Sequence, residues 1–193
     1  MRSLDPVSRE IDGADFPRAR QAPDEPGDCV VLALLGANAP RLRPAVVLPL
    51  TWRCGAAGHD RRLPAALASL ADRVRGELAP FLNRSGSRPD EWTLHWNARD
   101  SPDLSALPIA ADSAWGALFS GLVLAVEGIR PRPEVWITAA GDVEQGLSAV
   151  DLGDRGEKLQ TARDFGAAVV FVPPQTLPDA RRAIAVEPGL AGL

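Results

Sequence analysis

The sequence predicts a domain of the α/β (α+β) class, with a mixed sheet packed against three main helices. Segments rich in β-branched residues alternate along the chain with longer segments whose apolar residues recur at helical spacing. The 193 residues suffice for one ordinary domain and are too few for two. Residues 1–27 are charged and rich in proline, which predicts a flexible N-terminal arm, and the folded domain is expected over residues 28–193.

Strands are expected where β-branched residues crowd between turn residues, at 29–35, 45–52, 91–96, 134–138 and 167–173. In the third of these segments, alternation places Trp92, Leu94 and Trp96 on one face. The last segment is apolar throughout, which predicts a buried strand.

Two long helices are expected before residue 130. Residues 63–82 carry an apolar stripe at helical spacing, formed by Leu63, Leu67, Leu70, Val74, Leu78 and Phe81. Residues 113–127 are apolar on nearly every side and precede Gly128, a residue type that commonly ends helices. A buried helix is therefore expected to begin at Ser113.

Two further helices are expected near the end of the chain. The first covers 154–165, with Asp154 as the N-cap, Glu157 at the third position and Gly166 beyond the end. The second is a short terminal helix at 177–186.

Charge and composition argue against several classes of protein. The net charge is −4 and no basic cluster is longer than Arg-Arg, so no nucleic-acid partner is expected. No apolar run approaches a membrane span, and the charged N-terminus lacks the apolar stretch of a signal peptide, so no membrane association is expected. Two cysteines cannot build a disulfide framework, which predicts a cytoplasmic protein, and the excess of Arg over Lys is typical of GC-rich bacterial genomes.

Lysine occurs once, as Lys158, among the 21 basic residues. Arginine can replace lysine in surface charge pairs, but its pKa lies above 12 and it does not deprotonate. A lysine that is retained in such a chain therefore fits a role as a neutral amine. The alternative is a lysine that remained by chance on a solvated face.

The chain from Ser113 onward resembles the proteolytic domain of the Lon protease family. In that family a G-P-S-A-G motif opens a buried helix, a strand ends in T-G-E, and a G-G-L-K-E-K-L segment opens another helix. Here Ser113-Ala114 opens the apolar helix, and Thr138 ends a strand at the family's spacing of 25 residues. Glu157-Lys158-Leu159 matches the E-K-L segment, and the resemblance extends over roughly residues 29–175.

The resemblance implies a serine endopeptidase with a Ser-Lys dyad. Ser113 takes the position of the nucleophile, Lys158 that of the general base, and Thr138 that of the residue that supports the lysine. Residues that flank the serine would bind the substrate: Asp112, Ala114 and Trp115. Because the chain has no P-loop motif, such an enzyme would need no cofactor and would cleave flexible or unfolded polypeptide, alone or with a partner or regulator protein.

A Ser-Lys dyad needs a lysine with a lowered pKa and backbone donors for an oxyanion, and the expected positions of Lys158 and Ser113 suit both needs. A serine hydroxyl needs a neighbouring base, and a lysine amine can serve only when burial or positive charge lowers its pKa. Lys158 lies in the first turn of an expected helix, whose positive end disfavours the charged amine. Ser113, at the start of its own helix, would lie near free backbone N–H groups, which suit an oxyanion hole.

Several residues near the serine depart from the family pattern. Ala111-Asp112 stands in place of D-G-P, Trp115 in place of a glycine, and Gly153-Asp154-Arg155-Gly156 in place of G-G-L-K. These departures favour a second hypothesis, in which an inactive Lon-like domain serves as a protein-binding or assembly module. An oligomer is compatible with both hypotheses.

Cysteine and histidine offer weaker candidates for a site. Cys54 and His59 share a loop at C-x4-H spacing, and Cys29 and His95 are conceivable further ligands. Structural zinc sites use closer pairs such as C-x2-C, so no metal site is expected. The thiols are expected to be small packing or surface groups, and His95 a partly solvated strand residue.

Overall fold

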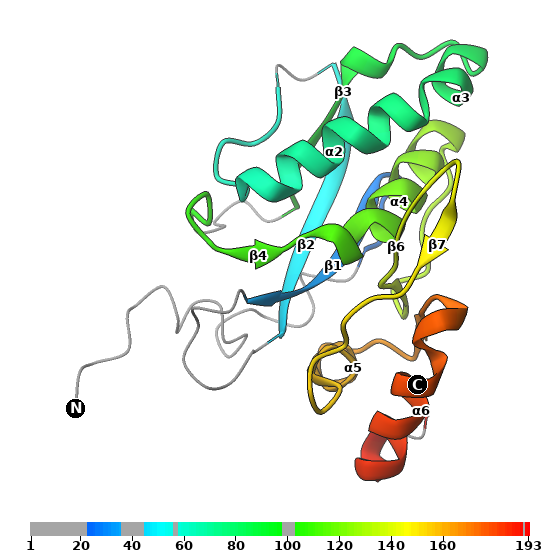
Figure 1. Cartoon of the computed structure of the whole chain (residues 1–193). Coiled ribbons are helices and arrows are strands. Elements are labelled where there is room, and N and C mark those ends of the chain that lie inside the picture. The colour runs from blue at the N-terminus through cyan, green and yellow to red at the C-terminus, as the bar shows by residue number, and fades with distance from the viewer. Residues whose placement is uncertain (1–22, 36–44, 56–57, 98–102, 191) are drawn as a thin grey trace.

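The structure is a computed structural model that describes residues 23–35, 45–55, 58–97, 103–190 and 192–193 (Figure 1). Residues 1–22 of the expected arm lie outside this description. In the described part, the largest sheet is antiparallel with strand order β3-β2-β1-β4. Its strands are β1 (Asp28–Leu35), β2 (Ala45–Cys54), β3 (Trp92–Trp96) and β4 (Ile109–Ala110).

Two smaller sheets complete the strands of the described residues. One pairs β5 (Val135–Ile137) with β8 (Val169–Phe171) in parallel, and the other is the hairpin of β6 (Ala140–Asp142) and β7 (Gly146–Ser148). The chain is therefore of the mixed α/β class, as predicted, but its strands form three sheets and not one mixed sheet. Strand β4 extends the ladder of β1 over only two residues, and β5 pairs with β8 and not with β1.

The described helices are α2 (Ala65–Glu77), α3 (Ala79–Arg84), α4 (Trp115–Glu127), α5 (Glu157–Asp164) and α6 (Leu177–Val186). Short 3-10 turns occur at Pro89–Glu91, Asp112–Ala114, Pro174–Thr176 and Pro188–Leu190. Figure 1 shows α5 and α6 gathered at one end of the molecule, apart from α2 and α3. None of the described helices combines the length and apolarity that a membrane crossing requires.

Strand β1 is buried on both faces, and its alternation divides the core in two. Cys29, Val31 and Ala33 pack into the larger core with α2 and α4. Val30 and Leu32 pack on the opposite face with Trp136 of β5 and with α5. Because successive side chains of a strand point to opposite faces, α4 and α5 cover opposite sides of β1.

The helix predicted over 63–82 is two helices. Its apolar stripe is buried as expected, with Leu67 and Val74 fully inaccessible to solvent. The chain breaks at Leu78, and Pro80 lies in the first turn of α3. A proline ring clashes with the carbonyl group four residues earlier, so one unbroken helix cannot pass through this position.

The predicted start of α5 is also wrong. Its N-cap is Gly156, whose φ is +74°, and Glu157 is the first helical residue. Asp154 therefore does not cap the helix, because a glycine reaches the left-handed region at little cost and turns the chain two residues later. Gly166 follows the end of the helix as predicted, and Lys158 lies in its first turn.

Strand β8 is not the buried strand that its composition predicts. Val169 is 40% exposed and Phe171 is 57% exposed. Among the described strands, β8 pairs only with β5, so it lies at the edge of a two-stranded sheet. An edge strand leaves one side uncovered, which a run of apolar residues does not reveal.

Candidate active site

Ser113 and Lys158 meet in the folded chain although 45 residues separate them. The Lys158 Nζ lies 2.7 Å from the Ser113 Oγ, within hydrogen-bond distance. Both side chains are buried, with 7% of Ser113 and 2% of Lys158 exposed. The solitary lysine is therefore not on a solvated face.

The short strand β4 allows the two residues to meet. Ser113 lies in the 3-10 turn before α4, on one side of β1, and Lys158 is the second residue of α5, on the other side. Strand β4 pairs only with Leu34 and Leu35, so it leaves the edge of β1 open at Leu32. The Ser113 Oγ lies 3.4 Å from the Leu32 carbonyl oxygen, which places the dyad beside this open edge.

Burial sets the electrostatics of the dyad. It lowers the pKa of Lys158 from 10.5 to about 8, against a smaller opposing effect of the Asp151 carboxylate. None of the ion pairs between described residues includes Lys158. Its position in the first turn of α5 adds the positive end of the helix dipole, which also disfavours the ammonium form.

Thr138 lies next to the backbone of the nucleophile. Its side chain is completely buried, and its Oγ1 has no hydrogen-bond partner among the described residues. The Thr138 N–H donates to the Phe171 carbonyl at 3.0 Å, and the Ala139 N–H donates to the Ser113 carbonyl at 2.9 Å. Thr138 is thus a buried hydroxyl near the dyad, and its role as a support for Lys158 stays a prediction.

Most backbone N–H groups after Ser113 are already engaged. The N–H of Ala114 donates to Ala111, that of Trp115 to Asp112, and that of Gly116 to Ala139. Of the four consecutive amides from Ser113 to Gly116, only that of Ser113 lacks an acceptor in the described part of the chain. The expected set of free N–H groups is therefore reduced to one, because the 3-10 turn engages the N–H groups of Ala114 and Trp115 and the Ala139 carbonyl accepts that of Gly116.

The three residues predicted to bind substrate differ in exposure. Asp112 is exposed, whereas Ala114 and Trp115 are 1% and 6% exposed. The Trp115 ring stacks on Phe119 at a centroid distance of 4.8 Å, and its Nε1 donates to the Glu77 carboxylate at 2.8 Å. A role of any of them in substrate binding stays a prediction.

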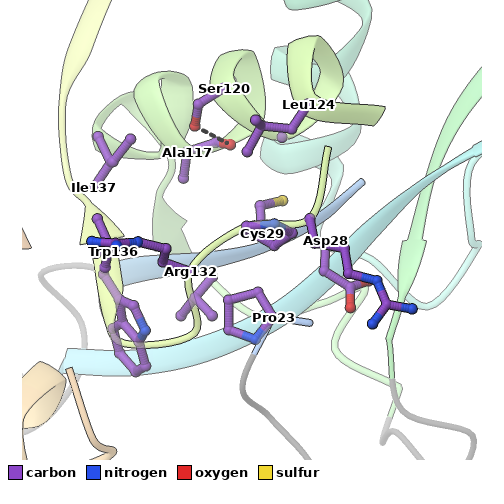
Figure 2. Close-up of a pocket in the computed structure, with 14 residues that line it drawn as sticks. Pro23, Asp28, Cys29, Ala117, Ser120, Leu124, Arg132, Trp136 and Ile137 are labelled. Atoms are coloured by element: carbon purple, nitrogen blue, oxygen red, sulfur yellow. Dashed lines mark hydrogen bonds between the residues drawn. The ribbon is translucent and has the colours of Figure 1, made fainter. Parts of the chain in front are cut away.

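A separate hollow of about 240 Å³ lies between α4, the first residues of β1 and strand β5 (Figure 2). Figure 2 shows Ala117, Ser120 and Leu124 on its α4 side, opposite Trp136 of β5. Neither Ser113 nor Lys158 lines it. Cys29 does, but burial raises the pKa of its thiol far above the usual range, so this cysteine does not supply a thiolate.

Both histidines contact other residues of the fold. The His59 Nδ1 accepts the Leu94 N–H at 2.8 Å, and its Nε2 lies 3.1 Å from Asp72. His95 is half-buried beside Thr93, and burial lowers its pKa. The described residues contain no group of three or more His, Cys, Asp or Glu side chains able to hold a metal ion.

Two residues at the site carry no sequence motif. Leu32 contributes a backbone carbonyl group, which leaves no trace in the residue type. Glu77 binds the Trp115 indole, and its only signal is the spacing of four residues from Arg73 on the expected helix.

Comparison with known proteins adds no family to this description. No family model matches the chain, and no curated protein matches it.

Proposed function

We propose that the chain is a Lon-like serine endopeptidase that uses Ser113 as its nucleophile and Lys158 as its general base. The observation that carries the proposal is the 2.7 Å contact between the Ser113 Oγ and the Lys158 Nζ, an amine whose pKa burial lowers to about 8. Lys158 is 2% exposed, and its amine lies within hydrogen-bond distance of the Ser113 hydroxyl, which supports a role for this lysine within the fold and not on a solvated face.

The reaction follows from this contact. In the neutral form, the Lys158 amine accepts the Ser113 proton as the Oγ bonds to the carbonyl carbon of a peptide. The resulting ammonium returns the proton to the leaving amine, the C–N bond breaks, and an ester remains on Ser113. Water then attacks this ester, with Lys158 again taking and returning a proton. The Ser113 N–H is the available backbone donor for the oxyanion.

The proposed substrate is flexible or unfolded polypeptide, cleaved alone or with a partner protein in a bacterial cytoplasm. The burial of the dyad supports this class, because a compact folded protein could not bring its backbone to the Ser113 and Lys158 side chains. No cofactor takes part in the proposed reaction, since the base and the nucleophile are both side chains of the chain.

The test compares wild type, Ser113→Ala and Lys158→Arg on a chemically unfolded, fluorescently labelled protein. Both variants are expected to lose at least about a thousandfold of the activity, because arginine keeps the charge but cannot become neutral. Arg84→Ala, which removes an exposed cation from α3, serves as the control and keeps the wild-type rate. Circular dichroism must show that each variant is folded.

The pH profile provides a second arm of the test. The value of kcat/KM is expected to rise about tenfold per pH unit below pH 8 and to level off above it, as the Lys158 amine becomes neutral. If folded Lys158→Arg keeps a substantial part of the wild-type rate, the Ser-Lys mechanism is wrong.

The engaged N–H groups of residues 114–116 favour one rival function, an inactive Lon-like domain that binds protein. A domain of this kind would bind the unfolded protein with equal affinity in wild type and in Ser113→Ala, and neither would cleave it. Cleavage by wild type alone excludes this rival.

A further inference from the structure

A closed ring of contacts includes the backbone of the nucleophile and passes through helix α2. The Trp115 Nε1 donates to the Glu77 Oε2 at 2.8 Å, and the Glu77 Oε1 lies 3.5 Å from the Arg73 Nε. The Arg73 guanidinium also donates to the Gly141 carbonyl in β6 at 3.2 Å. Glu77 thus connects the start of α4 to the segment that follows Thr138.

The ring closes through the backbone of the nucleophile. Two residues before Gly141, the Ala139 N–H donates to the Ser113 carbonyl at 2.9 Å. The Ala139 carbonyl accepts the Gly116 N–H, also at 2.9 Å. Since Trp115 lies between these two contacts in the chain, the ring returns to its starting point through the turn that carries Ser113.

Packing alone does not account for a glutamate at this position. The Glu77 side chain is 16% exposed, and burial of a carboxylate costs free energy unless donors satisfy it. With an apolar residue at position 77, the Trp115 ring would occupy the same space, but its N–H group would have no acceptor. The Glu77 Oε2 accepts a hydrogen bond from α4, and the Oε1 forms an ion pair with Arg73 within α2.

We infer that Glu77 is a positioning residue, which sets the placement of Ser113 relative to Thr138 and Lys158 through Trp115 and Arg73. This inference rests on the proposed function. A displacement of the reacting groups by about 1 Å can cost a hundredfold in rate, so a contact that fixes the start of α4 acts on catalysis without touching the substrate.

The kinetic test uses Glu77→Ala, Arg73→Ala and the double variant, with Arg84→Ala as the control. Each single variant is expected to lower kcat about 10- to 100-fold and to change KM less than about threefold. The double variant is expected to be no slower than the slower single variant, because both substitutions open the same ring. Losses that multiply in the double variant would overturn the inference.

A pair of conservative variants separates the hydrogen bond from packing. Trp115→Phe removes the indole N–H and keeps a ring to stack on Phe119. Trp96→Phe makes the same change at a buried tryptophan whose Nε1 has no partner among the described residues. We expect a lower kcat only in Trp115→Phe, and an equal loss in both would contradict the inference.

The solitary lysine permits a readout that does not need activity. In protein labelled with carbon-13 lysine, one Cε signal reports the titration of Lys158. Its pKa, about 8 in the wild type, is expected to rise by about 1 in Glu77→Ala, because a displaced Ser113 admits water to the amine. Glu77→Gln, which keeps an acceptor for the indole, should shift it less.

The two readouts distinguish failure of this inference from failure of the proposed function. If wild type cleaves nothing but the pKa of Lys158 rises in Glu77→Ala, the endopeptidase proposal fails and Glu77 still positions the pair. If wild type is active and folded Glu77→Ala keeps its kcat and its lysine pKa, the inference is overturned and the proposed function stands.

Discussion

The two members of the dyad are held by regions of very different construction. Ser113 precedes α4, which packs in the larger core through side chains such as Leu118 and Leu122, both fully buried. Lys158 lies on α5, whose neighbour α6 packs in a small cluster of Val150, Leu152, Leu159, Ala180, Ala183 and Leu190. Burial of large apolar groups supplies most of the free energy of folding, so α4 is much the better anchored.

The connection before α5 increases the contrast. Helix α5 has eight residues, and the turn that leads into it depends on Gly153 and Gly156, both with positive φ. Short elements with few large apolar contacts open locally at lower free energy than core elements. The nucleophile is therefore held by the larger core, and the base by a shorter helix on two smaller apolar clusters, which substitutions can disturb without unfolding the domain.

The largest expected effect is on stability in the α4 region. Leu122→Ala is expected to cost about 2–5 kcal/mol of the free energy of unfolding, because it leaves a cavity at a fully buried position. Leu177→Ala, at a position that is 41% exposed, is the matched control and should cost little. Urea titration measures both. A loss below about 0.5 kcal/mol for Leu122→Ala would refute the central placement of α4.

The second prediction concerns Lys158 itself and has the opposite sign. The pKa of Lys158 falls from 10.5 to about 8 on folding, so below pH 8 the folded state carries a charge that burial disfavours. The unfolded state binds more protons between pH 8 and 10.5, and stability therefore rises with pH across this window. Lys158→Met should be more stable than wild type at pH 7 by about 3 kcal/mol, and this difference should vanish above about pH 10.5.

Thermal or urea unfolding at pH 7, 9 and 10.5 checks that prediction. A gain that is independent of pH would mean that methionine packs better and that the charge has no part in it. A loss at pH 7 would mean that an ion pair stabilises the ammonium in the folded state.

The smallest expected effect on stability is in the α5 region. A Cβ on Gly156 would lie 2.5 Å from the Cβ of Ala183 in α6, and its φ of +74° disfavours alanine. Gly156→Ala should cost about 1–2 kcal/mol of stability and yet reduce peptidase activity at least about tenfold, since it displaces the first turn of α5. The control is Gly166→Ala, which has φ +97° and no neighbour within 4 Å. Equal activity in these two variants would remove the contrast between the regions.

Much of the local structure could be predicted from residue patterns. Helix α6 has the predicted bounds. The apolar stripe of α2 is buried as expected, and so are Trp92, Leu94 and Trp96 on one face of β3. The errors arise where one residue outweighs a pattern. Pro80 divides the first helix, Gly156 replaces Asp154 as the N-cap, and the apolar strand β8 lies at an edge.

The site shows the same division. The solitary lysine singles out Lys158 in the sequence, and the resemblance to the Lon proteolytic domain selects Ser113 and Thr138. The direction of the Trp115 indole could not be predicted, because its partner Glu77 lies 38 residues away on another helix. The engagement of the backbone N–H groups after Ser113 depended on a 3-10 turn that no residue type marks.

The sequence by itself determined which side chains are available for chemistry and which short segments become helices and strands, because propensity and periodicity act between near neighbours. Only the tertiary structure decided that β4 leaves the edge of β1 open and that α4 and α5 cover opposite sides of that strand. The contact of Ser113 with Lys158 and the lowered pKa of the amine follow from this arrangement. Desolvation depends on every atom packed around a group, and in a folded chain most of those atoms come from residues distant in sequence.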